Sequence, residues 1–257
     1  MALTSIRTNQ SDGVRRLTLA RPERRNALDE RLVAELHSEL ALAGVDPEVR
    51  VVLIDAEGPD FCAGADLDET LAQLDRMGPV ENLASARRLG DLLIAIRRLD
   101  KVVIGAVHGR ALAGGAGLAN ACDIVLAADD AKLGYPEVHH GLVPAMVGAI
   151  LRRSMGEKLA FELLARGHPI DAAEAARLGL VTRIFPAAEM PQRVTEYATE
   201  MASKSQSALT LIKRLFYGQD GLSFEEGIGR GAEVNVLARG TADARAGIQR
   251  FLDRRRR

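Results

Sequence analysis

The chain has 257 residues, of which 47% are hydrophobic and 27% are charged, as in an ordinary globular protein. Its 34 Lys and Arg nearly balance its 35 Asp and Glu, which argues against a dedicated nucleic-acid binder, because such proteins carry a basic excess. No apolar run approaches the ~20 residues of a membrane span, and residues 1–8 lack the apolar core of a signal peptide. We therefore expect a soluble, cytoplasmic protein that binds neither nucleic acid nor membrane.

The two cysteines, Cys62 and Cys122, give neither a disulfide framework nor the spacing of metal ligands. Each is expected to be a small buried thiol in a reducing compartment, and no metal is expected. The run of four arginines at residues 254–257 is interpreted as the solvated end of a helix, where basic side chains are favourable.

The first predicted elements are a hairpin and a capped helix. Residues 6–8 and 14–19 flank Ser11-Asp12-Gly13, a turn signal, and predict the hairpin. A basic loop follows over residues 21–28. Asp29 can then cap a helix whose apolar residues recur at helical spacing: Leu32, Val33, Leu36 and Leu40.

The next predicted strand is buried and lies at residues 51–54, where the chain is wholly apolar. It leads through the small-residue turn 61–67 into a helix. Residues 77–81 contain Gly78 and Pro79 and predict a mobile linker before a further helix over residues 82–99.

A glycine-rich stretch follows the short apolar run 102–107, which predicts a buried strand. Gly114, Gly115 and Gly117 precede a short helix and a second apolar run, 124–128. Glycines at a helix start let the backbone approach a ligand, and the first N–H groups of a helix lack intrahelical acceptors, so they can bind a developing oxyanion. Close packing of the helix against a strand explains the same glycines, and both interpretations stay open.

Phosphate binding by this stretch is disfavoured. A dinucleotide-binding fingerprint would need a third glycine at residue 120, which is Asn120. A P-loop would need Gly-Lys-Ser/Thr, which does not follow.

From residue 145 onward the pattern predicts one short strand, 181–184, and otherwise helices, at 145–154, 156–166, 172–178, 191–204, 208–217, 223–237 and 241–251. Strands that alternate with helices, followed by helices alone, predict an α/β core with a helical C-terminal portion. We divide the chain into a core of residues 1–200 and a helical region of residues 201–257.

Six motifs in this order resemble the enoyl-CoA hydratase/isomerase family, also called the crotonase family. They are Arg21-Pro…Arg25-Asn-Ala-Leu28, Phe61-Cys-Ala-Gly-Ala-Asp-Leu67, His108-Gly…Ala113-Gly-Gly-Ala-Gly-Leu-Ala119, Cys122-Asp123, Gly134-Tyr-Pro-Glu137 and Gly141-Leu-Val-Pro144. The resemblance implies a spiral of β-β-α turns with a C-terminal helical region that serves oligomerisation and covers the site. It also implies homotrimers or homohexamers and acyl-CoA thioester substrates, with no cofactor beyond the coenzyme A of the substrate.

The resemblance assigns a role to eight residues. The backbone N–H groups of Ala65 and Gly114 would polarise the thioester carbonyl, and Glu137 would exchange protons. The coenzyme A would be bound by Arg25, Ala27, Ala63, Asp66 and Leu67. From the residues alone, Arg25 could also be a solvated loop arginine, Ala65 a turn residue and Glu137 a surface carboxylate, although the functional role is favoured for each. For Asp66 the favoured interpretation is the cap of the helix it opens.

The match is incomplete at the acid/base residues. Hydratases of this family typically use two glutamates, of which the second corresponds to Glu137 and the first falls at Gly117. Burial beside a thioester raises the pKa of a carboxyl toward neutrality, which suits proton exchange.

Other residues near Glu137 in the sequence are weaker candidates. His139 and His140 titrate near neutrality, but on an extended segment at most one of them could face the site. Tyr135 and Asn120 could hold water. Asp123 is expected to anchor the start of a strand.

Three functions follow from these residues. The first is a 2-enoyl-CoA hydratase, in which Glu137 handles the protons. The second is a Δ3,Δ2-enoyl-CoA isomerase, which needs only one carboxylate and is favoured by Gly117. The third is an acyl-CoA-binding subunit without turnover, which the pairing of Glu137 with two oxyanion donors opposes. We place the hydratase slightly ahead.

Overall fold

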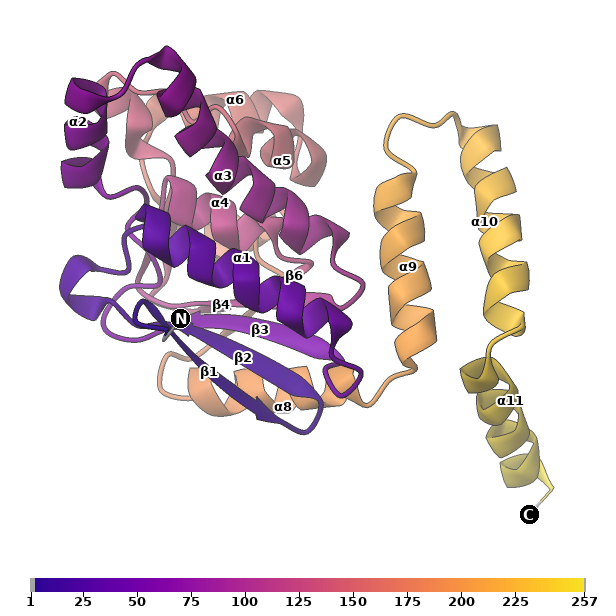
Figure 1. The fold of residues 1–257 in the computed structure, drawn as a ribbon. Coiled ribbons are helices and arrows are strands. Elements are labelled where there is room, and N and C mark those ends of the chain that lie inside the picture. The colour runs from indigo at the N-terminus through magenta and orange to yellow at the C-terminus, as the bar shows by residue number, and fades with distance from the viewer. Residues whose placement is uncertain (1–2, 257) are drawn as a thin grey trace.

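The centre of the molecule is a six-stranded sheet with the strand order β1-β2-β3-β4-β6-β9 (Figure 1). The computed structural model describes residues 3–256. The strands are β1 (Ile6–Ser11), β2 (Val14–Leu19), β3 (Val51–Ala56), β4 (Val102–Val107), β6 (Ile124–Ala128) and β9 (Arg183–Phe185). The first two pair antiparallel, and all the other neighbours in this sheet are parallel.

The predicted hairpin is confirmed. Ser11 pairs with Val14 across a two-residue turn, in which Asp12 and Gly13 have φ of 51° and 76°. Positive φ at both central residues gives the turn the twist of the strands, and Asp-Gly adopts it readily.

Helices cover both faces of this sheet. α1 (Glu30–Val45) lies on one face with α3 (Pro79–Arg98) packed beside it, and α8 (Met190–Ala202) lies on the other (Figure 1). Successive side chains of a strand point to opposite faces, so Val52 and Ile54 of β3 join the core under α1, whereas Val51 and Leu53 pack against α8. A strand buried on both faces needs the continuous apolar run that the sequence has there.

A second, three-stranded sheet consists of β5 (Arg110–Leu112), β7 (Lys132–Gly134) and β8 (Ile170–Asp171). One isolated bridge, Leu28 to Ala65, joins two loops beside it, and another, Cys62 to Ala111, joins one of those loops to β5. The other elements around it are η1 (Pro22–Arg24), α2 (Leu67–Arg76), α4 (Gly114–Ala121), η2 (Pro136–His140), α5 (Val147–Ser154), α6 (Glu157–Arg166) and α7 (Ala172–Arg177).

The linker between α2 and α3 is shorter than the predicted residues 77–81. Only Met77 and Gly78 separate α2 from α3, because Pro79 is the first residue of α3 and Gly78 its N-cap. Proline suits the first position of a helix, where its missing N–H has no intrahelical acceptor to lose. The helix expected from residue 82 therefore begins three residues earlier.

The C-terminal segment is helical, as expected, and consists of α9 (Gln206–Gly218), α10 (Phe224–Arg239) and α11 (Ala242–Arg255). α9 stands beside the core, and α10 and α11 extend away from it (Figure 1). Large apolar side chains are exposed here: Phe216, Phe224, Ile228, Val236, Leu237, Ile248 and Phe251. The division at residue 200 stays a prediction, and Arg257 of the arginine run lies outside the described residues. Among residues 3–256, no helix is both long and apolar enough to cross a bilayer.

Candidate active site

A cavity of about 280 Å³ lies between α3, α4, η2 and α5. It brings together five of the residues predicted from sequence, and its lining is mostly apolar. Those five are Ala63, Ala65, Leu67, Gly114 and Glu137; leucines of α3 and residues 142–147 complete the wall. Residues 63–67, Gly114 and Glu137 come from three separate parts of the sequence, so their meeting in one cavity is a property of the fold.

The Ala65 N–H belongs to a peptide group whose other end is fixed. The carbonyl oxygen of Gly64 accepts a hydrogen bond of 2.7 Å from Leu28 N. In a trans peptide the C=O and N–H point in opposite directions, so the Ala65 N–H points away from Leu28. Ala65 lines both the cavity of Gly114 and Glu137 and the neighbouring cavity that Leu28 borders, so the wall between the two carries this N–H. Within residues 3–256, no protein acceptor takes it.

The Gly114 N–H is oriented in the same way. The carbonyl oxygen of Ala113 accepts 3.0 Å from Gly117 N in the first turn of α4, and Ala113 N donates 2.8 Å to the Gly134 carbonyl. Ala113 has φ of 50° and ψ of −124°, a conformation that costs an alanine of order 1–3 kcal/mol. Across the described part of the chain, Gly114 N–H also has no protein acceptor, as expected for the first residue of a helix.

The two loops that carry these N–H groups touch each other at a glycine. A Cβ at Gly64, whose φ is 99°, would lie 2.7 Å from the Ala113 Cβ. Only glycine lets Ala65 and Gly114 approach in this way. Gly115 serves packing instead, because a Cβ there would lie 2.4 Å from the Cys62 carbonyl oxygen. Close packing therefore explains Gly115, whereas the oxyanion-binding interpretation of Gly114 stays a prediction.

Glu137 lies on η2 and is half-buried at the cavity wall. Burial raises the pKa of its carboxyl above the ordinary value. Its Oε2 is buried, and nothing within residues 3–256 hydrogen-bonds to it. A carboxylate with a raised pKa and an unsatisfied oxygen facing an apolar cavity is suited to exchange protons with a bound ligand.

Gly117 faces away from open space. A Cβ at this position would lie 2.4 Å from Cγ1 of Val147, the first residue of α5. Gly117 does not line the cavity, whereas Val147 does. The space that a side chain at 117 would enter is therefore filled by a valine methyl group.

His139 and His140 do not lie on an extended segment, because both belong to the 3₁₀ helix η2, and only His140 lines the cavity. Side chains three residues apart eclipse in such a helix, so Glu137 and His140 share a side, and both line the cavity. The His139 ring instead lies 5.3 Å from that of His168, centroid to centroid.

Tyr135 and Asn120 bind each other rather than a water in the cavity. Asn120 Nδ2 donates 2.8 Å to Tyr135 Oη, both residues are buried, and neither lines the cavity. Burial raises the pKa of the Tyr135 hydroxyl.

The residues expected to bind coenzyme A lie on loops next to the cavity. Ala63 N donates 3.0 Å to the Arg25 carbonyl, which joins the basic loop to the wall. The Arg25 side chain is exposed, whereas Ala27 is buried, and neither lines the cavity. Asp66 caps α2, since its Oδ1 accepts 3.3 Å from Glu69 N. Leu67 reaches the cavity.

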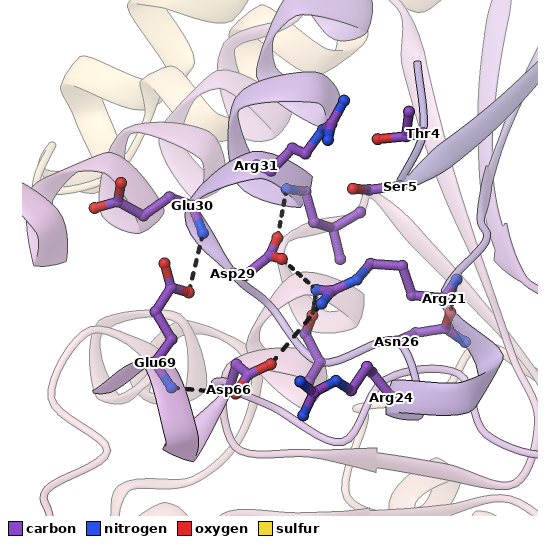
Figure 2. A network of polar contacts seen from close by, with 12 residues as sticks. Thr4, Ser5, Arg21, Arg24, Asn26, Asp29, Glu30, Arg31, Asp66 and Glu69 are labelled. Carbon is purple, nitrogen blue, oxygen red and sulfur yellow. Dashed lines mark hydrogen bonds and ion pairs between the residues drawn. The ribbon is translucent and has the colours of Figure 1, made fainter. Parts of the chain in front are cut away.

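Sequence reasoning noted Arg21 only as part of a motif and missed its contacts. Its Nη1 lies 2.6 Å from Asp29 Oδ2 and its Nη2 lies 3.9 Å from Asp66 Oδ2, so one guanidinium joins the caps of α1 and α2 (Figure 2). All three side chains are largely buried. The available signal was an arginine followed by two aspartates, each at the start of a predicted helix.

Comparison with known proteins identifies the family. The family model described as enoyl-CoA hydratase/isomerase matches residues 9–257. The chain belongs to the enoyl-CoA hydratase/isomerase family. It is 37% identical over 233 residues to a "Probable enoyl-CoA hydratase" of Bacillus subtilis, covering 90% of this chain and 89% of that one. It is 33% identical over 240 residues to the 2,3-dehydroadipyl-CoA hydratase of Escherichia coli, covering 93% and 92%.

Solved structures of the enoyl-CoA hydratase/isomerase family have the same fold. The crystal structure of an enoyl-CoA hydratase of Mycobacterium smegmatis superposes with a TM-score of 0.93 at 31% identity, covering 98% of this chain and 97% of that one. The predicted crotonase-like α/β fold is therefore confirmed, and the protein is an enzyme of this family.

Proposed function

We propose that the protein is a 2-enoyl-CoA hydratase, which adds water across the α,β double bond of an acyl-CoA thioester. The observation that carries this proposal is the shared cavity of Ala65, Gly114 and Glu137. The thioester oxygen accepts hydrogen bonds from the Ala65 and Gly114 N–H groups. The carbonyl oxygens of the same two peptides accept hydrogen bonds from Leu28 N and Gly117 N, which fixes their orientation. Each such donor is worth about 3–4 kcal/mol in the transition state.

One carboxylate is enough to balance the reaction. The Glu137 carboxylate takes a proton from water as the water oxygen bonds to C3 of the substrate, and the electron pair of the double bond moves to the thioester oxygen as an enolate. The carboxylic acid so formed returns the proton to C2, and the thioester carbonyl is restored. Because burial raises the pKa of Glu137, the two proton transfers are better matched near neutral pH.

The site also supports a second function, Δ3,Δ2-enoyl-CoA isomerisation. Gly117 and Val147 leave no room for a second carboxylate at the position where the family's other glutamate would stand. An isomerase needs only Glu137, which would move one proton between C4 and C2. A non-catalytic acyl-CoA-binding subunit is the remaining alternative.

Paired assays of purified protein separate the three functions. Hydration of a 2-enoyl-CoA removes the absorbance of the conjugated thioester, whereas isomerisation of a 3-enoyl-CoA creates it. The hydratase proposal predicts the higher kcat/KM for the first reaction, and the opposite order makes the protein an isomerase. Glu137→Gln should lower kcat by about 10²–10⁴ with acyl-CoA binding nearly intact. Binding of both esters without turnover of either would leave only the non-catalytic function.

Arg25 is proposed to bind the nucleotide part of coenzyme A, with Ala27, Ala63, Asp66 and Leu67 shaping the adjoining wall. The exposed side chain of Arg25, whose backbone carbonyl accepts from Ala63 N, supports this role, because arginine suits phosphate groups. Arg25→Ala should raise KM for an enoyl-CoA and leave KM for the matching enoyl-pantetheine, which lacks the nucleotide, unchanged. Equal effects on both esters would contradict it.

The enzyme is further proposed to assemble as a homotrimer or a homohexamer. The exposed apolar side chains of α9–α11 support this, since Phe216 and Phe224 are 70% and 78% exposed in the single chain. Light scattering of the eluted protein should give three or six times the chain mass of 27.6 kDa. A monomer at micromolar concentration would contradict the proposal.

A further inference from the structure

Two hydrogen-bonded peptide groups connect the Arg21 guanidinium to the Ala65 N–H. Arg21 Nη1 donates 2.9 Å to the Ala27 carbonyl oxygen. The N–H of that same peptide belongs to Leu28 and donates 2.7 Å to the Gly64 carbonyl oxygen. The N–H of the Gly64–Ala65 peptide is the one proposed to hold the thioester oxygen. A chain of guanidinium, peptide, peptide and ligand results, which we call the Arg21 relay.

In each peptide of the Arg21 relay, the direction of the C=O fixes the direction of the N–H. A planar trans peptide cannot turn its N–H without turning its C=O by the same angle. The direction of the Ala65 N–H therefore depends on the Leu28 N–H, and that in turn depends on what the Ala27 carbonyl accepts. Hydrogen bonds in series also polarise one another, so a charged donor at the head makes the last N–H a stronger donor.

The Arg21 guanidinium, at which the Arg21 relay begins, lies between two carboxylates (Figure 2). Asp29 and Asp66 bind the guanidinium at 2.6 and 3.9 Å through their Oδ2 atoms. Their Oδ1 atoms accept from the first turns of α1 and α2, at 2.8 Å from Leu32 N and 3.3 Å from Glu69 N. With Arg21 and Asp66 side chains only 16% and 10% exposed, water competes little for these contacts.

The loop itself provides a further anchor. Arg21 N donates 2.8 Å to Asn26 Oδ1, and Asn26 Nδ2 donates 2.9 Å to each of the Glu57 and Asp60 carbonyl oxygens. The loop is thereby fixed at residues 21 and 26, and Asp66 N, which donates 3.1 Å to the Leu28 carbonyl oxygen, holds the far side of Leu28. The Arg21 side chain adds the contact to the Ala27 carbonyl of the one peptide that faces Gly64.

We infer that Arg21 is a positioning residue of the active site, which orients and polarises the Ala65 N–H through the Arg21 relay without touching the substrate. This inference rests on the proposed role of Ala65 as an oxyanion donor. It assigns a function to an arginine that the motif alone leaves unexplained.

The test compares Arg21→Met with Arg31→Met. Arg31 is a matched control because it also pairs with a carboxylate, Glu35 at 3.0 Å, but lies on α1 outside the Arg21 relay. Arg21→Met should lower kcat about 10- to 10²-fold with KM changed less than about threefold, since a misdirected donor is lost mainly from the transition state. Arg31→Met should keep both constants.

Loss of stability is separated from loss of positioning by a second variant. Arg21→Met leaves Asp29 and Asp66 without their cation, and the double variant Arg21→Met/Asp29→Asn removes one of those charges while keeping an N-cap side chain. The double variant should regain part of the lost stability and keep the low kcat. If kcat recovers together with stability, Arg21 serves the fold alone and the inference is overturned.

A spectroscopic measurement makes the test independent of turnover. Bound acetoacetyl-CoA ionises to an enolate when its thioester oxygen is stabilised, and the enolate absorbs in the near ultraviolet. The enolate-to-keto ratio should fall about tenfold or more in Arg21→Met and stay unchanged in Arg31→Met. An unchanged ratio in Arg21→Met overturns the inference. If the wild type turns over no enoyl-CoA, the proposed function is contradicted, whatever the enolate-to-keto ratio shows about Arg21.

Arg21→Lys provides the test if the Met variants do not fold. A lysine keeps the positive charge between Asp29 and Asp66 but has one nitrogen in place of the fork that reaches both of them and the Ala27 carbonyl. A fall in the enolate-to-keto ratio with a native circular dichroism spectrum supports the Arg21 relay. An unchanged ratio overturns it.

Discussion

The ammonium group of Lys213 on α9 lies 2.7 Å from Oδ2 of Asp123, at the start of β6. The same nitrogen donates 2.9 Å to each of the carbonyl oxygens of Ile96 and Lys101, and Asp123 Oδ2 also accepts 2.7 Å from Val103 N. Lys213 is only 7% exposed, and burial lowers its pKa. This single side chain therefore joins the first C-terminal helix to the end of α3 and to the starts of two central strands.

Lys213→Met should destabilise the protein by about 3–5 kcal/mol, because it leaves the Asp123 carboxylate buried without its cation. Lys204→Met is the matched control, since Lys204, just after the C-cap of α8, pairs with Glu200 at 2.9 Å on the exposed surface. Such a pair is worth about 0.3–0.5 kcal/mol. Urea denaturation followed by circular dichroism measures both. A Lys213→Met variant within about 1 kcal/mol of wild type would show that the pair contributes little.

Two neighbouring glycines, Gly114 and Gly115, should lose different amounts of stability on the same substitution to alanine. A Cβ at Gly115 would lie 2.4 Å from the Cys62 carbonyl oxygen, whereas at Gly114 its nearest neighbour is Leu28 Cδ1 at 3.1 Å, the flexible end of a side chain. Gly115→Ala should therefore cost about 3 kcal/mol or more, and Gly114→Ala about 1 kcal/mol or less. Thermal unfolding ranks the two, and a reversed order would mean that the Cys62 loop shifts freely.

Glu137 should make stability depend on pH in a defined direction. Burial raises its folded pKa above the unfolded value, so the folded state binds more protons between the two pKa values and stability falls as pH rises through that window. A glutamine in Glu137→Gln does not ionise, so the variant does not lose stability in this way. The variant should be more stable than wild type above the folded pKa, and the difference should vanish below the unfolded pKa of about 4.3. Denaturant titrations of both proteins at pH 4 and pH 8 measure the difference in the free energy of unfolding. If the variant is more stable by the same amount at both pH values, ionisation of Glu137 is not the cause.

The thiols should not react in the native protein. Cys62 is fully buried, and burial raises its thiol pKa to about 12, while Cys122 is buried with its pKa raised as well. A chromogenic disulfide reagent at pH 8 should label neither thiol before unfolding and both in denaturant. Labelling of the native protein at the rate of a free thiol would contradict the described burial.

Much of the fold could be predicted from sequence because local rules determine it. Asp12-Gly13 selects the hairpin turn, Asp29 caps α1, and the apolar run of β3 suits a strand buried on both faces. Gly78-Pro79 predicts a break because proline also ends helices, but proline equally suits the first helical position, which is the one it occupies in α3.

The candidate site was only partly predictable. Backbone donors such as Ala65 and Gly114 follow from glycine patterns and family motifs, and the fold places both beside Glu137. The Arg21 relay was not predictable, because it depends on which carbonyl the guanidinium reaches, and that is decided by the tertiary packing of two loops. The steric role of Val147 was missed for the same reason, since thirty residues separate it from Gly117.

The contact between Gly117 and Val147 has a consequence for how such enzymes can evolve. A glutamate at residue 117 is opposed while Val147 is present, because its Cβ would lie 2.4 Å from Val147 Cγ1 and one of the two helices would have to shift. Val147→Ala removes that methyl group and costs about 1–3 kcal/mol by itself, and the next valine atom, Cβ, lies at an ordinary 3.7 Å from the added Cβ. The path from one carboxylate to two therefore has a favoured order, in which the permissive change on α5 precedes the chemical one on α4. A protein whose stability cannot tolerate the loss caused by Val147→Ala would keep a single glutamate, even if a second one improved the reaction.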